Sequence, residues 1–211
     1  MRLLVLRHAE AEGNRDNRLM GQSNLKLTTR GLAQARSVAQ TIDDTEAINA
    51  LYSSPLTRAR ETAEFLSERL GLPVKIINEL KEIDIGPLEG LNSAERQEQY
   101  PEFIAQWNKN PVKASLSGVE PLDKLQHRAW KALNCIVAAH KDQETIAIIS
   151  HSLLITTVIC KVLSLPLGRF RDIRVDLASI SILQYRNNSF LLKDLNILRH
   201  LPHSLLPKGQ D

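Results

Sequence analysis

The chain lacks several features that mark secreted and membrane proteins. It has only two cysteines among 211 residues, Cys135 and Cys160, and they are too far apart for a CxxC pair. Buried, reduced thiols are the plain interpretation, which suits a cytoplasmic protein. The best candidate for a membrane span, Leu153–Cys160, is too short to cross a bilayer. Arg7 interrupts the N-terminal apolar run too early for a signal peptide, so we expect no membrane partner.

The chain also lacks a strong excess of one charge. Its 27 lysines and arginines against 24 acidic residues give a net charge of only +3. Arg169, Arg171 and Arg174 lie close together, but Asp172 and Asp176 interrupt them, so we expect a solvated surface and no nucleic-acid groove. A P-loop Gly-x-x-x-x-Gly-Lys and a metal-binding His/Asp cluster are missing as well. The sequence therefore predicts neither a bound cofactor nor a bound metal.

Apolar periodicity predicts alternating strands and helices. Strands are expected near 2–7, 47–53, 74–79, 145–150, 178–185 and 189–195, and helices near 29–42, 55–70, 92–108, 121–140 and 152–164. This alternation predicts the α/β class, as a three-layer α/β/α sandwich with a mostly parallel sheet. The turn signal Asn187-Asn188 predicts one antiparallel hairpin at an edge. For the second helix we expect Ser54 as N-cap, Pro55 in the first turn and Gly71 at the end.

We expect residues 1–211 to form a single domain, which is within the usual size range. The segment from about 84 to 120 is polar and rich in proline, so it is interpreted as an insertion over the carboxyl end of the sheet. Insertions of that kind act as lids that decide substrate choice. The tail from about 200 to 211 has a polar end and is expected to be loose.

Two of the predicted strands end close to a histidine. The apolar run Leu3–Leu6 is followed by Arg7 and His8, and Ile146–Ile149 is followed, after one serine, by His151. Open α/β sheets bind their ligands at the carboxyl ends of the strands. A lone histidine in such a place is more often a core residue whose ring nitrogens are hydrogen-bonded and which has no catalytic role. Two histidines with an arginine beside them instead predict a site for an anion and histidine chemistry on that anion.

Two further segments supply charge. Arg58 falls in the first turn of the helix expected over 55–70, where a cation opposes the helix dipole at a cost of roughly 0.3–1 kcal/mol. A bound phosphate would make this position favourable for Arg58, because both the helix N-terminus and the guanidinium attract the anion. The alternative is an ordinary surface ion pair between Arg58 and Glu61 or Glu64. The loop 79–90 holds several carboxylates, one of which can serve as a general acid. Most such runs are merely solvated turns.

Together, in this order and at these spacings, the segments resemble the histidine phosphatase superfamily, the phosphoglycerate mutase-like proteins. The resemblance extends from Leu6 to about Leu201. The matching residues are Arg7-His8-Ala9-Glu10, Asn14, Gly21-Gln22-Ser23, Leu27-Thr28 with Gly31, Ser53–Ala59, Glu82 with Gly86, Glu89-Gly90, Ser150-His151, and Leu195-Asn196 with His200-Leu201. The resemblance implies a metal-independent phosphomonoester hydrolase that acts through a phosphohistidine.

The resemblance also implies a role for each residue. His8 would be the nucleophile, and Glu82 would protonate the leaving alcohol and later take a proton from water. Arg7, Arg58 and His151 would hold the phosphoryl oxygens, which is the positioning and charge stabilisation that phosphoryl transfer requires. A backbone carbonyl is expected to fix the neutral tautomer of His8. The residues expected to line the pocket near the phosphate are Asn14, Gln22 and Ser23.

Several positions depart from the family pattern. Many relatives have glycine where this chain has Ala9, and threonine or serine where it has Ala11, so a hydroxyl near the phosphate is lost. Asn24 and Lys26 replace the usual aspartate and proline, and Val119 interrupts a common Gly-Glu-Ser of the lid. These changes leave the implied catalytic residues intact but weaken any transfer of a relative's substrate.

Alternatives to a phosphatase stay open. The family's cofactor-dependent phosphoglycerate mutases have a longer insertion rich in lysine and arginine. Residues 92–120 here contain three cations against four acidic residues, which favours hydrolysis of a small phosphorylated metabolite, and the Gly-Gln-Ser stretch also looks like α-ribazole phosphatases. A catalytically weak regulatory protein that binds a phospho-ligand is the third alternative; the presence of both His8 and Glu82 argues against it. The oligomeric state, monomer or homodimer, is left open by the sequence.

Overall fold

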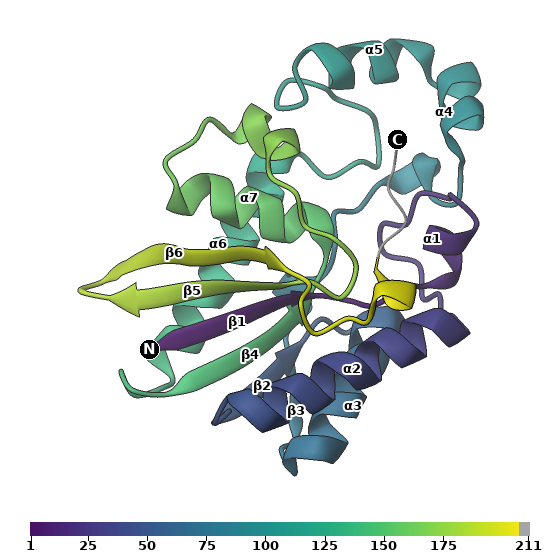
Figure 1. The fold of residues 1–211 in the computed structure, drawn as a ribbon. Helices are drawn as coiled ribbons and strands as arrows, with labels where there is room; N and C mark the ends of the chain where they lie inside the picture. Colours follow the sequence, from purple (N-terminus) through teal and green to yellow (C-terminus); the bar gives the residue numbers. More distant parts are fainter. Residues whose placement is uncertain (207–211) are drawn as a thin grey trace.

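The structure is a computed structural model that describes residues 1–206. Within them, one six-stranded sheet has the order β3-β2-β4-β1-β5-β6 (Figure 1). Neighbours among the first four strands of this order pair in parallel, and β5 is antiparallel to both β1 and β6. The strands are β1 (Arg2–Arg7), β2 (Ala50–Ser53), β3 (Val74–Ile76), β4 (Thr145–Ser150), β5 (Ile180–Arg186) and β6 (Ser189–Ile197). The predicted parallel sheet with an antiparallel hairpin at one edge is confirmed.

The register of the two central strands brings their carboxyl ends together. Strands β1 and β4 pair from Arg2 and Thr145 to Arg7 and Ser150 without a slip. Both are apolar runs that are buried almost throughout, as expected for parallel strands covered on both faces. His8 therefore leaves the sheet beside the residue that follows Ser150, and its backbone N–H donates to the Ser150 carbonyl at 2.9 Å.

Helices cover both faces of the sheet (Figure 1). Side chains such as Leu4 and Leu6 of β1 pack with α2 and α3, whereas Leu3 and Val5 point to the opposite core beneath α6 and α7. This alternation along a strand creates the two cores of a three-layer α/β/α sandwich and confirms the expected class. The helices are α1 (Glu12–Arg15), α2 (Thr29–Thr45), α3 (Thr57–Leu70), α4 (Ser93–Gln99), α5 (Pro101–Lys109), α6 (Leu122–Ala138) and α7 (Ser152–Val162).

The predicted start of the second helix is wrong. Helix α3 begins at Thr57, and its N-cap is Leu56, so Ser54 and Pro55 precede it. The Ser54 hydroxyl instead accepts the Leu56 N–H at 3.3 Å and contacts a histidine of the site. At the other end Gly71 has a φ of 66° and ends the helix as predicted, because this left-handed conformation suits glycine.

The segment 84–120 lies beyond the carboxyl ends of the parallel strands and carries α4 and α5 (Figure 1). The single helix expected over 92–108 is two helices, because Pro101 disfavours a helical conformation at Tyr100 and begins the second one. Among residues 1–206, no helix combines the length and the apolar character that a membrane crossing needs.

The expected loose tail is wrong for residues 200–206. His200 is buried and its Nε2 contacts the Ala178 carbonyl at 2.8 Å. Helix α2 holds the next residues, since the Gln34 side-chain amide donates to the Leu205 carbonyl at 2.9 Å. These contacts connect positions far apart in the sequence, and composition does not reveal them. Residues 207–211, where the same expectation applied, lie outside the described residues.

Candidate active site

His8 stands at the end of β1 with its ring fixed in one tautomer. Its side chain is buried, and Nδ1 lies 2.7 Å from the Ala9 carbonyl oxygen. A carbonyl only accepts hydrogen bonds, so Nδ1 carries the proton. Nε2 is then the nitrogen with a lone pair, and it accepts a hydrogen bond from Nε of Arg58 at 3.2 Å. The backbone carbonyl expected to set the tautomer is Ala9.

The surroundings of His8 keep the ring neutral. Burial lowers the pKa of His8 well below its usual 6.5, and the positive charges of Arg58 and then Arg7 lower it further. A neutral imidazole with a free lone pair is the form that a nucleophilic histidine requires. In this form Nε2 of His8 can act as a nucleophile once Arg58 releases it.

Arg58 lies in the first turn of α3 and is almost fully buried. Its two terminal nitrogens donate to the Gly21 carbonyl at 2.7 Å and to the Ser23 carbonyl at 2.8 Å. Burial lowers the pKa of Arg58 to about 10, so the guanidinium stays charged at neutral pH. The carboxylate of Glu89 accepts the backbone N–H groups of Gly21 and Gln22 at 3.0–3.1 Å. Arg58 and Glu89 together fix the loop that approaches His8.

Two buried side chains beside His8 each have a nitrogen without a hydrogen-bond partner within residues 1–206. Arg7 donates to the Val175 carbonyl at 2.8 Å, but within residues 1–206 its Nε has no hydrogen-bond partner. The ring centroid of His151 lies 5.2 Å from that of His8. Its Nε2 contacts the Ser54 hydroxyl at 2.8 Å, whereas its Nδ1 has no hydrogen-bond partner within residues 1–206. Burial, and then Arg58, lower the pKa of His151 well below 6.5. Positive and unsatisfied nitrogens beside a neutral His8 suit an anionic group.

The carboxylate of Glu82 lies at the N-terminus of α7, a contact that the sequence did not predict. Its carboxylate accepts the backbone N–H groups of Leu153 at 3.0 Å and Leu154 at 3.2 Å, in the first turn of α7, as well as that of Ile83 at 3.0 Å. A carboxylate is favourable at the positive end of a helix dipole. The N-terminus of α7 is therefore occupied by Glu82, and the side chain of its N-cap residue, His151, makes no capping bond.

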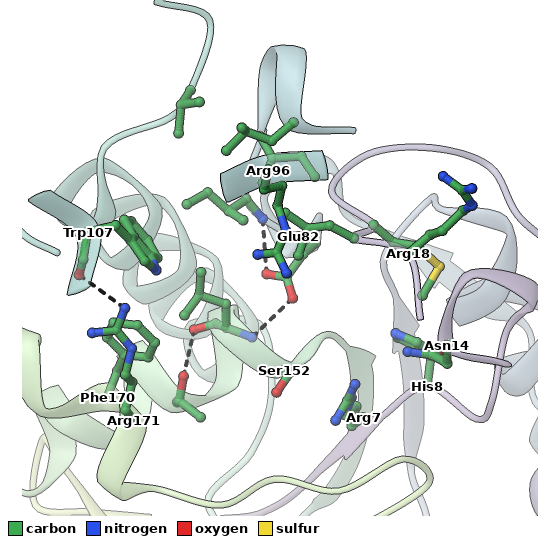
Figure 2. Close-up of a pocket in the computed structure, with 18 of the residues that line it drawn as sticks. Arg7, His8, Asn14, Arg18, Glu82, Arg96, Trp107, Ser152, Phe170 and Arg171 are labelled. Carbon is green, nitrogen blue, oxygen red and sulfur yellow. Dashed lines mark hydrogen bonds between the residues drawn. The ribbon is translucent and has the colours of Figure 1, made fainter. Parts of the chain in front are cut away.

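A cavity of about 440 Å³ joins these groups (Figure 2). Its lining includes five of the predicted site residues, namely Arg7, His8, Asn14, Arg58 and Glu82. Gln22, Ser23 and His151 are not part of the lining. Gln22 donates its side-chain amide to the Glu82 carbonyl at 3.2 Å, and Ser23 binds Arg58 through its carbonyl, so both lie behind the residues that face the cavity.

The far wall of the cavity combines aromatic rings with an arginine and was not predicted from the sequence. Phe103 and Trp107 of α5 and Phe170 of the 3₁₀ turn Leu167–Asp172 line it. The ring centroids of Trp107 and Phe170 are 6.0 Å apart, and the guanidinium of Arg171 lies over both rings. Figure 2 shows this group on the side of the cavity away from His8 and Asn14. The only sequence signal for it was the position of the lid.

Comparison with known proteins gives one consistent result. The family model for the histidine phosphatase superfamily (branch 1) matches residues 3–198. Phosphoserine phosphatase 1 of Hydrogenobacter thermophilus is 32% identical over 201 residues, which cover 95% of this chain and 94% of that protein. The structure is similar to Bacillus stearothermophilus YhfR, with a TM-score of 0.89, 25% identity and coverage of 94% and 98% of the two chains. It is also similar to the α-ribazole phosphatase of Shigella flexneri, with a TM-score of 0.85, 26% identity and coverage of 93% and 96%.

Proposed function

Because the chain belongs to the histidine phosphatase superfamily (branch 1), we propose that His8 is its nucleophile and Glu82 its proton donor. As a member of that superfamily with phosphatase relatives, the protein is a phosphomonoester hydrolase that acts through a phosphohistidine on small phosphorylated metabolites. The observation that carries the residue assignment is the neutral His8, whose Nε2 lone pair lies beside Arg58 in the cavity wall.

In the first step, Nε2 of His8 attacks phosphorus while the bond from phosphorus to the ester oxygen breaks. Arg58 releases Nε2 and donates to the phosphoryl oxygens, together with the unpartnered Nε of Arg7. His151 lies close enough to offer its ring to the same group. Charged donors at fixed positions stabilise the transferring phosphoryl group without a metal.

Glu82 serves the leaving oxygen. When Glu82 takes a proton from solvent, it loses the charge that the N–H groups of Leu153 and Leu154 bind, and the side chain is released from the α7 terminus. The protonated group then gives its proton to the departing alkoxide. In the second step the carboxylate takes a proton from water, the hydroxide attacks phosphorus, and the P–N bond to His8 breaks. Inorganic phosphate and an alcohol leave, Glu82 returns a proton to solvent, and both side chains are back in their starting states.

The cavity wall supports a preference among leaving groups. Phe103, Trp107 and Phe170 give the cavity an aromatic wall that also holds Arg171, and Glu82 is the one acidic side chain that lines the cavity among the described residues. The ammonium group of an amino-acid phosphate would thus meet no second carboxylate, and desolvation of that charge would oppose binding. We expect 2-phenylethyl phosphate to exceed both ethyl phosphate and phosphoserine in kcat/KM; all three release a primary alcohol. A higher value for phosphoserine would contradict this preference.

A mutase is less well supported. Of the three cations in residues 92–120, only Arg96 lines the cavity, whereas Lys109 and Lys113 are exposed. Arg18 and Arg171 also line the cavity, so the argument against a mutase is the small number of cations that the segment 92–120 itself contributes. Rapid interconversion of 2- and 3-phosphoglycerate with little phosphate released would favour the mutase. Phosphate binding without any turnover would favour the regulatory protein.

Composition and chain organisation further support a single domain, a cytoplasmic location, and no nucleic-acid or membrane partner. Metal independence follows from the charged side chains of the site, and a homodimer is the oligomeric alternative to a monomer.

The decisive experiment traps the intermediate. The protein is mixed with p-nitrophenyl phosphate, quenched, and digested for mass spectrometry under conditions that preserve phosphohistidine. We expect a phosphoryl adduct on His8 that is absent from His8→Asn and present in His127→Asn, which alters an exposed histidine. Glu82→Gln should still form the adduct from p-nitrophenyl phosphate but slow the release of alkyl alcohols. An adduct elsewhere, or normal alkyl phosphate turnover in both site variants, would refute the assignments.

A further inference from the structure

Arg128 of α6 lies outside the cavity lining, yet it holds the loop that carries Glu82. One terminal nitrogen donates to the carbonyls of Glu79 at 2.7 Å and Lys81 at 2.6 Å, and the other donates to the carbonyl of Glu82 itself at 2.8 Å. We propose that Arg128, together with Glu120, is a positioning residue for proton transfer by Glu82. This proposal rests on the function proposed above for Glu82.

Glu120 orients the side chain of Arg128 and adds further hydrogen bonds to the loop that carries Glu82. The two carboxylate oxygens accept Nε and one terminal nitrogen of Arg128 at 2.7 and 2.8 Å, a two-pronged geometry that orients the guanidinium. Both side chains are mostly buried, with exposed fractions of 21% and 16%. Glu120 also binds the backbone of Asp84. Its carboxylate accepts the Asp84 N–H at 3.2 Å, and its own backbone N–H donates to the Asp84 carbonyl at 2.8 Å. The pair therefore binds the backbone on both sides of Glu82.

These backbone contacts matter most when Glu82 acts. In the ligand-free structure the Glu82 carboxylate is held by Leu153 and Leu154 of α7. The side chain must leave those N–H groups to reach a leaving oxygen, so the backbone anchors from Arg128 and Gln22 then help define its position. An error of about 1 Å in the position of a catalytic group costs about 100-fold in rate. Arg128 is therefore expected to act on the proton transfers of Glu82, the first of which depends on the leaving group.

This role differs from simple support of the fold. If Arg128 only joined α6 to the loop, its loss would slow every substrate by a similar factor. If it positions Glu82, the loss should depend on how strongly the leaving group needs a proton. 4-Nitrophenolate leaves without one, whereas an alkoxide does not. The comparison of the two leaving groups separates the interpretations.

The test uses Arg128→Met and Arg128→Lys, with p-nitrophenyl phosphate and 2-phenylethyl phosphate as substrates. We expect kcat/KM, which reports the transfer of the phosphoryl group to His8, to fall roughly 10- to 100-fold for the alkyl phosphate and by no more than about threefold for p-nitrophenyl phosphate. Glu120→Gln should act in the same direction with a smaller effect. The matched control is Arg69→Met, which removes an exposed ion pair with Asp43 and should leave both rates unchanged.

A double variant gives a second readout. When Glu82→Gln has already removed the proton donor, Arg128→Met should cost little more on the alkyl phosphate, because there is no donor left to position. Equal losses on both substrates, or additive losses in the double variant, would overturn the proposal. If Glu82→Gln alone selectively slows the alkyl phosphate and Arg128→Met does not, the function of Glu82 stands and only the positioning role fails. If Glu82→Gln slows neither substrate, both proposals fail.

Discussion

The two buried histidines of the site predict how the stability of the protein depends on pH. Burial, followed by the charge of Arg58, lowers the pKa of His8 and of His151 well below 6.5. In the unfolded chain each imidazole regains a pKa near 6.5 and binds a proton below that pH. The unfolded state then binds more protons than the folded state, so stability must fall as the pH drops below 6.5, until the folded pKa is reached.

The magnitude follows from proton linkage. For each histidine that stays neutral in the folded state, the free energy of unfolding of the protein falls by about 1.4 kcal/mol per pH unit below 6.5. Between pH 7.5 and pH 5.5 the integrated loss is about 1.4 kcal/mol per histidine, or about 2.7 kcal/mol for His8 and His151 together. His200, whose pKa is also lowered by burial, adds a contribution of the same sign.

Urea denaturation at pH 7.5, 6.5 and 5.5 in phosphate-free buffer measures the effect as a change in the free energy of unfolding. His8→Asn and His151→Gln should each remove roughly 1.4 kcal/mol of the pH dependence. His127→Asn, at an exposed position, should retain it. An unfolding free energy that is constant, or that rises, between pH 7.5 and 5.5 would refute the argument. So would a pH dependence that is undiminished when both His8 and His151 are replaced.

Three further outcomes are expected. EDTA should leave the turnover of p-nitrophenyl phosphate unchanged, because charged side chains supply the electrostatics; a loss restored by a divalent metal would count against that pocket. Arg58→Lys should lower kcat/KM about 100-fold or more, since lysine cannot contact His8, Gly21 and Ser23 together; steady-state kinetics within tenfold of the wild type would contradict this. Gly86→Ala should destabilise the protein by about 1–3 kcal/mol in thermal unfolding, because its φ is +48° and a Cβ would lie 2.5 Å from the Gly118 carbonyl oxygen. An unchanged unfolding temperature would show that the backbone there adapts.

Local sequence patterns predicted the sheet and the part of the site built on it. Apolar runs defined β1 and β4, and a histidine follows each of them, so the pairing of these two strands was enough to bring His8 and His151 together. Arg58 was placed correctly in the first turn of α3, although the helix begins two residues later than the serine and proline before it suggested. Patterns of this kind depend on residues that are neighbours along the chain.

The remainder depends on contacts over long separations. Glu82 reaches the first turn of α7 across 72 positions, and Trp107 meets Phe170 across a similar stretch. No periodicity or turn signal connects such residues. Gln22 and Ser23 illustrate the same limit, because a motif placed them near the phosphate whereas the structure uses them behind Glu82 and Arg58.

The anchors of the two chemical roles belong to opposite layers of the sandwich. Arg58 extends from α3, whereas Glu82 is held by Arg128 of α6 and by the first turn of α7 on the other face. Mutations that accumulate in one layer therefore leave the anchors of the other largely undisturbed. A lineage, or a laboratory library confined to the lid and the α6 side, is free to exchange one alcohol for another while the phosphate-handling residues are inherited unchanged. Diversity of substrates on a constant reaction is the evolutionary pattern that this division permits.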